Sequence, residues 1–394
     1  MITKLFYSLI LSFGLFFSTA LSTVVYAENT FTIAYLELKK DPRYKKKRLL
    51  ARFTGQALGR PFAGAKVAIK EVKYHGADID TALVLERKTV KKEELSSAVE
   101  EFNSKGVQFI ILDLPSPETT ELIKKFKGKD IAFFNISSYD NTLRNEACQS
   151  NLFHTLPSHA MLMDALAQFL ISKKWRDILV LEGKLPEDKQ MSSAFQTSAK
   201  RYGLKIKDRR IFKLGNDPRE RAKNNVALLT GGNFDVIFIA DTDGEYARDL
   251  PYQTLKPNLI VGSEGLSASA WHWGWERHGA PQLIKRFIKK NKRLMENTDW
   301  AAWMAVKAIA TAVQETKSTD YKKMISYLRA DSTALDTFKG HASSFRPWNN
   351  QLRQTILLTT HNWVVTRAPL KGFLHQKNNL DTLGNEERNS KCKF

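Results

Sequence analysis

The feature that most constrains the fold is a regular alternation of short apolar runs with longer amphipathic ones. Helical patterns lie between the apolar runs, and several stop at a glycine directly after the last apolar position, the usual end of a helix. Alternation of this kind predicts an α/β protein whose parallel sheets are covered by helices on both faces. The expected strands cover residues 31–37, 82–88, 108–114, 131–137, 177–183, 205–214, 234–241 and 258–264.

The alternation stops after Leu266. The pattern there predicts three helices, and then a β-rich segment over 343–369. From Lys377 onward the residues are polar and predict a loose tail. A chain of 394 residues exceeds the roughly 250–300 residues at which single cores divide, so we expect two lobes. The three expected helices cover residues 281–297, 299–316 and 321–330.

The N-terminus has the three parts of a secretory signal: a positive charge at Lys4, an apolar run, and small residues before a cleavage point. We therefore expect a signal peptide over residues 1–27, cleavage after Ala27, and a soluble periplasmic product that starts at Glu28. A membrane anchor is the alternative, but polar and glycine residues interrupt the apolar run. The residue directly after the cleavage point is Glu28 and not a cysteine, which argues against a lipid anchor.

Basic residues clearly outnumber acidic ones, with 61 Lys and Arg against 41 Asp and Glu and a net charge of +20. Such a balance suits nucleic acid or an anionic membrane surface. The lysines are, however, scattered over the expected helix faces, with one dense run at Lys39–Arg48, and no nucleic-acid-binding motif accompanies them. We interpret the charge as a solvated basic surface and expect no nucleic-acid partner.

Cys148 and Cys392 are the two cysteines of the chain. In an oxidising compartment they could form a single disulfide that ties down the tail, or they could stay reduced. Neither has the spacing of a metal site.

The sequence also lacks the nucleophile-elbow, phosphate-loop, dinucleotide-loop and zinc-protease motifs. We therefore expect a protein that is not an enzyme and has no cofactor.

The order of the segments resembles the type I periplasmic binding proteins of ABC transporters, in the leucine/isoleucine/valine-binding family. The resemblance covers roughly residues 30–375 and includes VQFIILDLPSPETTELI, IAFFNISSYDNTLR, NLFHTLPSHAMLMDALAQFL and LIVGSEGLS. Four further segments look closest to one subgroup, the binding proteins encoded with pyrroloquinoline-quinone (PQQ)-dependent alcohol dehydrogenase systems. These segments are WHWGWERHGAPQL, DWAAWMAVKAIA, SFRPWNNQLRQTILL and GFLHQKNNLDTLG.

This resemblance implies two Rossmann-like lobes that are joined by three crossovers. Lobe one would comprise residues 28–152 and 266–336, and lobe two residues 153–265 and 337–376, followed by a polar tail over 377–394. The resemblance also implies that a small-molecule ligand is captured between the lobes by hinge closure and delivered to an ABC permease in the inner membrane. Proteins of the PQQ-dependent dehydrogenase system are candidate further partners.

On lobe one, the candidate contacts lie in loops that follow strands, because ligands of parallel sheets bind beyond the carboxyl ends of the strands. Ser116 and Thr119 stand at a helix start, where hydroxyls and free amides can hold an anion, although plain N-capping explains them equally well. Asp113 precedes them. Family members that bind amino acids usually have a Gly-Pro-x-Ser-Ser loop here, so this carboxylate weakens the case for an amino-acid ligand. The next strand-following loop adds Ser137, Ser138 and Tyr139.

On lobe two, Asp241, Asp243 and Glu245 lie within five residues at the end of an expected strand. Three carboxylates repel one another unless they are paired, lie at a helix start or bind a cation. Hard cations such as calcium or a lanthanide take oxygen ligands of this kind, so a metal ion held by these three is one hypothesis and helix capping is the other. Glu264 is the last residue of the next expected strand and is a further candidate contact.

The stretch Trp271–His278 holds three tryptophans and two histidines in eight residues. Capped by one of the preceding serines, it predicts a helix that ends at Gly279. Helical spacing would put Trp271 and Trp275 on one face and Trp273 on another. Trp271 and Trp273 are therefore candidate ligand contacts, and burial of all three rings in the core is the alternative of equal weight.

Three hypotheses remain for the ligand or role. A small organic molecule linked to alcohol oxidation is favoured by the tryptophans. A periplasmic accessory or sensor protein is favoured by the basic surface. A hard metal ion is favoured by the carboxylates of Asp113, Asp241, Asp243, Glu245 and Glu264. We favour the organic ligand, because a strongly basic chain does not favour the gathering of cations and capping accounts for the acids.

Overall fold

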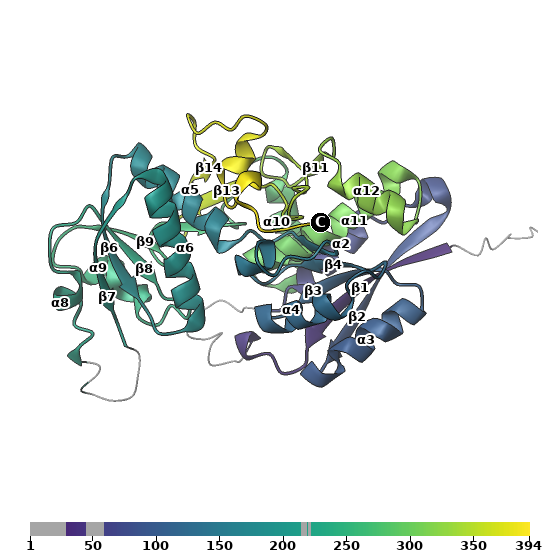
Figure 1. Cartoon of the computed structure of the whole chain (residues 1–394), viewed down its shortest axis with the longest axis horizontal. Helices are drawn as coiled ribbons and strands as arrows, with labels where there is room; N and C mark the ends of the chain where they lie inside the picture. The colour runs from purple at the N-terminus through teal and green to yellow at the C-terminus, as the bar shows by residue number, and fades with distance from the viewer. Residues whose placement is uncertain (1–28, 45–58, 214–218, 220–221) are drawn as a thin grey trace, which may run out of the picture.

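The computed structural model describes residues 29–44, 59–213, 219 and 222–394, and it contains two parallel sheets. Sheet A has the strand order β2-β1-β3-β4-β5, and sheet B has the order β7-β6-β8-β9. Figure 1 shows the two sheets at opposite ends of the molecule, with β13, β14 and the C-terminal residues between them. The predicted α/β class with parallel sheets is confirmed.

Sheet A is buried between two layers of helices. Phe109 and Ile111 of β3 pack on one face, whereas Ile110 and Leu112 pack on the other. Because both faces are covered, the strand is a continuous apolar run, as the sequence predicts. The strands are β1 (Asn29–Leu38), β2 (Thr81–Val90), β3 (Phe109–Asp113), β4 (Ala132–Asn135) and β5 (Leu152–His154). One layer contains α2 (Phe62–Glu71), α10 (Ala280–Asn291), α11 (Asn297–Thr316) and α12 (Tyr321–Arg329), and the other contains α3 (Leu95–Ser104) and α4 (Ser116–Lys125).

Sheet B is covered in the same way. Val180 and Phe238 face one layer, and Leu181 and Ile239 face the other. Its strands are β6 (Asp177–Glu182), β7 (Lys205–Ile211), β8 (Val236–Ala240) and β9 (Leu259–Gly262). The first layer contains α5 (His159–Ser172) and α6 (Pro186–Tyr202), and the second contains α8 (Val226–Thr230) and α9 (Leu250–Gln253).

Smaller elements complete the chain. An antiparallel sheet has the order β10-β13-β14, and β11 pairs with β12. These strands are β10 (Ser267–Ser269), β11 (Leu335–Asp336), β12 (Ala342–Ser343), β13 (Ile356–Thr359) and β14 (Val364–Ala368). Short 3₁₀ helices are η1 (Pro42–Tyr44), η2 (Ala77–Ile79), η3 (Lys92–Glu94), η4 (Thr142–Arg144), η5 (Ala247–Asp249), η6 (Asn379–Thr382) and η7 (Glu387–Asn389).

The three segments that connect the two cores are joined by buried hydrogen bonds. Lys339 donates from Nζ to the carbonyl of Ala270 and to Oε1 of Gln354, each at 2.9 Å. Gln354 in turn donates from Nε2 to the carbonyl of Thr155 at 2.8 Å. Thr155 follows β5, Ala270 follows β10 and Gln354 precedes β13. One small cluster therefore links all three connections between the sheets.

The segment with three tryptophans is not a helix, so that prediction is wrong. Ser267–Ser269 form β10, which pairs with β13, and residues 271–279 form loops and turns before α10. Trp271 and Trp275 are buried in the core of sheet A, whereas Trp273 is partly exposed. The strand pairing is a long-range interaction, and it outweighs the helical spacing of the aromatic residues.

The C-terminal residues pack against the molecule, so the expectation of a loose tail from Lys377 is wrong. Asp381 is only 1% exposed. Its Oδ1 accepts hydrogen bonds from Nε of Arg346 at 2.8 Å and from Nε of Arg353 at 3.0 Å. Leu383, which follows closely in the sequence, is also fully buried. A paired, buried carboxylate thus fixes a segment whose polar composition predicts mobility.

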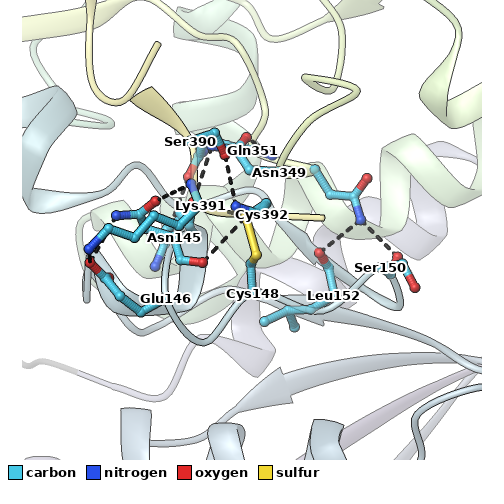
Figure 2. The surroundings of a disulfide bond; sticks show 12 residues. Asn145, Glu146, Cys148, Ser150, Leu152, Asn349, Gln351, Ser390, Lys391 and Cys392 are labelled. Carbon is cyan, nitrogen blue, oxygen red and sulfur yellow. Dashed lines mark hydrogen bonds and ion pairs between the residues drawn. A yellow bond between two sulfur atoms is a disulfide. The ribbon is translucent and has the colours of Figure 1, made fainter. Parts of the chain in front are cut away.

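The end of the tail is held by a disulfide, which was one of two alternatives that the sequence allowed for the cysteines. Cys392 is bonded to Cys148, which lies in the loop between β4 and β5 (Figure 2). Lys391 donates its backbone N–H to Oδ1 of Asn145 at 2.7 Å, and its ammonium group pairs with Glu146 at 2.9 Å. The tail is therefore attached covalently to the sheet A half of the molecule.

Some predictions concern residues that lie outside the described ranges. The secretory signal with cleavage after Ala27 lies there, as does part of the basic run Lys39–Arg48. None of the helices within the described ranges is both long enough and apolar enough to cross a membrane.

Candidate ligand-binding site

The loops that follow β1, β3 and β4 come together at one edge of sheet A. These three strands are neighbours in the sheet, and in parallel sheets their carboxyl ends lie on the same side. The loop after β1 contains η1, the loop after β3 leads into α4, and the loop after β4 contains residues 136–140. Of the predicted contacts, Asp113 ends β3, Ser116 and Thr119 lie in the first turn of α4, and Ser137, Ser138 and Tyr139 lie in the loop after β4.

Asp113 ends β3 and is fully buried, and side chains of the β1 loop engage its carboxylate. Arg43 donates from Nη2 to Oδ1 of Asp113 at 3.0 Å, and the Tyr44 hydroxyl donates to the same oxygen at 2.9 Å. Arg43 also pairs with Asp41 at 2.6 Å. Burial raises the pKa of Asp113, and the nearby Arg43 and Tyr44 groups act in the opposite direction. This carboxylate thus fastens the β1 loop to β3.

A second carboxylate on the same edge, that of Glu37 in β1, is also fully buried. Arg60 lies 3.3 Å from its Oε2, and Arg87 pairs with its Oε1. Thr89 donates its hydroxyl to Oε1 at 2.8 Å. Arginine side chains therefore neutralise both buried acids at the carboxyl edge of sheet A.

The hydroxyls at the start of α4 take part in bonds within the protein. Ser116 donates its hydroxyl to Oδ2 of Asp140. Thr119 is buried and donates its hydroxyl to the carbonyl of Pro115 at 2.9 Å. Pro115 is the N-cap residue and provides no side-chain cap. The anion-cradle interpretation of this loop therefore rests on backbone amides at the helix start.

The loop after β4 is shaped by the side chain of Asn135. Its Oδ1 accepts the backbone N–H groups of Ser137 and Ser138 at 3.2 and 2.9 Å, and its Nδ2 donates to the Ser138 carbonyl at 2.9 Å. The Ser137 hydroxyl donates to the carbonyl of Leu114 at 3.2 Å. Tyr139 packs against the cores of both sheets. Among the predicted contacts, Tyr139 thus lies at the boundary between the two halves.

A neutral imidazole accompanies Tyr139. The ring of His159, the first residue of α5, lies 5.4 Å from the Tyr139 ring, centroid to centroid. Burial, together with the positive charge of Arg144, lowers the pKa of His159 to about 4. His159 is therefore uncharged at neutral pH, and the pair offers an aromatic surface without net charge.

On sheet B, Asp241 follows β8 and caps the next turn. Its Oδ2 accepts the backbone N–H groups of Tyr246 and Ala247, each at 2.8 Å, at the start of η5. Burial raises the pKa of Asp241, against the effect of these two hydrogen bonds. Of the two hypotheses for this acidic loop, the observed geometry of Asp241 matches capping.

The remaining acids of lobe two do not assemble around Asp241. Asp243 is partly exposed and Glu245 is exposed. Glu264 accepts the backbone N–H of Gly265 at 3.1 Å. Within the described ranges, no group of three or more His, Cys, Asp or Glu side chains could hold a metal ion. The structure therefore does not bring the three acids together as a cation site.

Sequence reasoning missed Asp188, which is another buried carboxylate at this edge. Its Oδ1 accepts both the backbone N–H and the hydroxyl of Thr242 at 2.7 Å, and its Oδ2 accepts the N–H of Leu185 at 3.1 Å. The Ser263 hydroxyl accepts the N–H of Asp241 at 2.9 Å. A first-turn acid in α6, just beyond β6, was the signal that could have revealed it.

Comparisons with known proteins agree with this architecture. A family model described as periplasmic binding protein matches residues 52–224. A branched-chain amino acid ABC transporter ligand-binding protein from Burkholderia xenovorans matches with a TM-score of 0.66 at 16% identity, over 86% of this chain and 95% of its own. A solute-binding protein from R. palustris in complex with benzoate matches with a TM-score of 0.66 at 11% identity, over 93% and 100%.

A third solved structure is the leucine-, isoleucine-, valine-, threonine- and alanine-binding protein from Brucella ovis in a closed conformation. It matches with a TM-score of 0.65 at 13% identity, over 84% of this chain and 89% of its own. The chain has the type I periplasmic binding protein fold. No curated protein sequence matches it.

In the type I periplasmic binding protein fold, the loops at both edges described above directly follow strands of the two parallel sheets. Sequence reasoning located these strand-following loops but not the side chains that organise them. Arg43 and Tyr44 belong to the run interpreted as a solvated basic surface, yet they hold Asp113. An arginine-tyrosine pair within six residues of the end of β1 was the available signal.

The remaining predicted contacts differ in accessibility. Trp271 is 2% exposed and its ring stacks on that of Trp300, with centroids 6.2 Å apart, so it serves the core. Trp273 is partly exposed. The two edges of this type I fold therefore offer backbone amides and the Tyr139 ring. The Ser116, Thr119 and Ser137 hydroxyls donate within the protein, and the buried acids pair with arginines or accept backbone N–H groups.

Proposed function

We propose that this chain is a periplasmic solute-binding protein of an ABC uptake system, and that it binds a small organic ligand between sheet A and sheet B. The observation that carries the proposal is the pair of parallel sheets joined by three connections, with polar strand-following loops on each. Closure about the connections near Thr155, Ala270 and Gln354 encloses the ligand and presents it to an ABC permease in the inner membrane. No bond is made or broken.

The solved structures with the same fold support this class of ligand. Their descriptions name branched-chain amino acid transport, benzoate and small aliphatic amino acids, all of them small organic molecules. The bonding of the acids in this chain also favours an organic ligand over a cation. Arginines neutralise Glu37 and Asp113, and Asp241 accepts hydrogen bonds from backbone amides. Carboxylates in such use are not available as ligands of a hard cation.

The finer parts of the proposal rest on the sequence resemblance. They are export with cleavage after Ala27, the lobe ranges 28–152 with 266–336 and 153–265 with 337–376, and a link to PQQ-dependent alcohol oxidation. The segments WHWGWERHGAPQL and GFLHQKNNLDTLG support that link. We propose Ser137, Ser138 and Tyr139 as the main ligand contacts of the first half.

A thermal-shift screen tests the proposal. The purified protein is mixed with amino acids, short alcohols and aldehydes, small carboxylates, calcium and a lanthanide. A true ligand at about 100 times its Kd stabilises the protein by about 2.7 kcal/mol. Tyr139→Ala should abolish the shift, while Tyr252→Ala should preserve it, because Tyr252 is 90% exposed.

Small-angle scattering separates the alternatives. An organic ligand that stabilises the protein should also reduce its radius of gyration, as expected for closure of two lobes. A response to the lanthanide alone, lost in the Asp241→Asn/Asp243→Asn variant, would replace the organic ligand by a metal ion. No response to any compound and an unchanged radius would favour the accessory or sensor protein.

A further inference from the structure

A groove of about 540 Å³ lies on the surface between α10 and the tryptophan-rich segment before it. One wall is made by Trp273 and Trp275, and the other by Pro281, Ile284 and Ile288 of α10. None of the residues that line the groove follows a strand of sheet A or sheet B. The groove is therefore separate from the strand-following loops of the proposed interlobe site.

The aromatic wall of the groove is held in place by hydrogen bonds. Trp275 is 8% exposed, and its Nε1 donates to the carbonyl of Phe338 at 3.0 Å. Trp273 stacks on His272 with ring centroids 5.3 Å apart. The His272 ring is itself anchored, because its Nδ1 accepts the backbone N–H of Gly274 at 3.0 Å. An apolar ligand would therefore meet a preformed wall and cost little ordering of side chains.

The rim of the groove is basic. Lys285 and Lys289 stand one turn apart on α10 and both line the groove, and neither forms an ion pair with a residue that the structure describes. Two ammonium groups one turn apart on the same wall give the groove a local positive potential, which an anion would relieve.

We propose that this groove binds an apolar carboxylate. The hydrocarbon or aromatic body of the ligand lies against Trp273 and Ile288, and its carboxylate lies between the ammonium groups of Lys285 and Lys289. Ligand sites of about 300–1,000 Å³ are typically lined by apolar and aromatic side chains with a few charged groups that orient the ligand. Glu276 is the one acid among the lining residues, so the site selects against a second negative charge.

Calorimetric titration with octanoate tests the proposal, with 1-octanol and octylamine as probes of similar chain length and different charge. Octanoate should bind saturably and more tightly than either. Lys285→Gln/Lys289→Gln should weaken octanoate by about tenfold or more, because a charge-assisted contact is lost, and should leave 1-octanol unchanged. Trp273→Ala should weaken both octanoate and 1-octanol. All of these side chains are at the surface, so the variants should retain the fold.

Two control variants make the result specific. Lys322→Gln/Lys323→Gln on α12 removes the same number of charges from an exposed helix face, and it should bind octanoate like the wild type. Tyr139→Ala should also bind octanoate normally, because Tyr139 belongs to the interlobe site. Equal weakening in the α12 variant, equal binding of octylamine, loss of binding in Tyr139→Ala, or no saturable binding of octanoate would each overturn the proposal.

Discussion

The carboxyl edges of the two sheets both bury carboxylates, but they stabilise them by different means. On sheet A, Asp113 and Glu37 are fully buried and lie against arginines. On sheet B, Asp241 and Asp188 accept hydrogen bonds from backbone amides, and Asp188 also from the Thr242 hydroxyl. An arginine can be removed by mutation and a backbone amide cannot. The Asp113 and Glu37 carboxylates of sheet A therefore depend on a few side chains, and the Asp241 and Asp188 carboxylates of sheet B depend mainly on the course of the chain. Glu182, which ends β6, is a carboxylate on sheet B that pairs with an arginine, Arg209, at 2.9 Å.

The largest effect should come from Arg43→Met. This change leaves Asp113 and Asp41 buried without their cation, and breaking a buried pair in this way costs about 3–5 kcal/mol. Urea denaturation should show that loss in the free energy of unfolding. The control variant is Lys207→Met at the amino end of sheet B, whose partner Asp177 is 38% exposed at 3.6 Å, and it should cost at most about 1 kcal/mol. Equal losses in the two variants would mean that burial does not make the Arg43 pairs more important than an exposed pair.

An intermediate effect is expected from Cys148→Ser/Cys392→Ser. The tail contacts helices of sheet B, where Gly384 donates its N–H to Asp164 at 2.7 Å, while the disulfide attaches it to the sheet A half. Loss of the crosslink should lower the free energy of unfolding by about 2–4 kcal/mol. It should also increase amide hydrogen exchange in residues 385–392. Reducing agent should reproduce the loss in the wild type and have no effect on the variant, and a variant as stable as the wild type would contradict the prediction.

The smallest effect should come from Asp241→Asn. The folded-state pKa of Asp241 is raised by burial, so between the unfolded and folded pKa values the folded state binds more protons. Stability contributed by this group is therefore lost as the pH rises through the folded pKa, and at pH 7 its ionisation opposes folding. Because Asn caps about as well as Asp, the variant should match or exceed the wild type within about 1 kcal/mol at pH 7.

The pH dependence sharpens this last test. Any advantage of Asp241→Asn in urea denaturation should shrink as the pH falls below about 3.9, where the wild-type carboxyl is protonated in both states. A loss of several kcal/mol at pH 7 would instead mean that the negative charge is needed, either by the fold or by a bound cation.

Most elements of both sheets were predictable from the sequence because their signal is local, whereas the three-residue strand β5 (Leu152–His154) of sheet A was missed. The runs at 108–114 and 234–241 correspond to β3 (Phe109–Asp113) and β8 (Val236–Ala240), and each strand is buried on both faces. Helix ends at glycine were equally readable, as at Gly203 after α6. The loops of the candidate site followed from the same local information, since ligand contacts of a parallel sheet lie after its strands.

The partners of the buried charges could not be predicted in this way. Asp113 and Arg43 are 70 residues apart, and no periodicity relates them. The same applies to Asp188 and Thr242, which are 54 residues apart. Sequence pattern marks a polar residue at a strand end, but it does not say whether the protein or a ligand will use that residue.

The sequence by itself determined the α/β class, the positions of most strands of the two parallel sheets and the loops in which ligand contacts are to be sought, because apolar periodicity and glycine stops act over a few residues. Only the tertiary structure decided that Ser267–Ser269 form a strand, that Asp381 holds the tail in place, and that Arg43 neutralises Asp113. Each of these outcomes depends on a partner far along the chain. Leaving a buried charge without its partner costs more free energy than any local preference supplies, and the partner is in place only after the chain has folded.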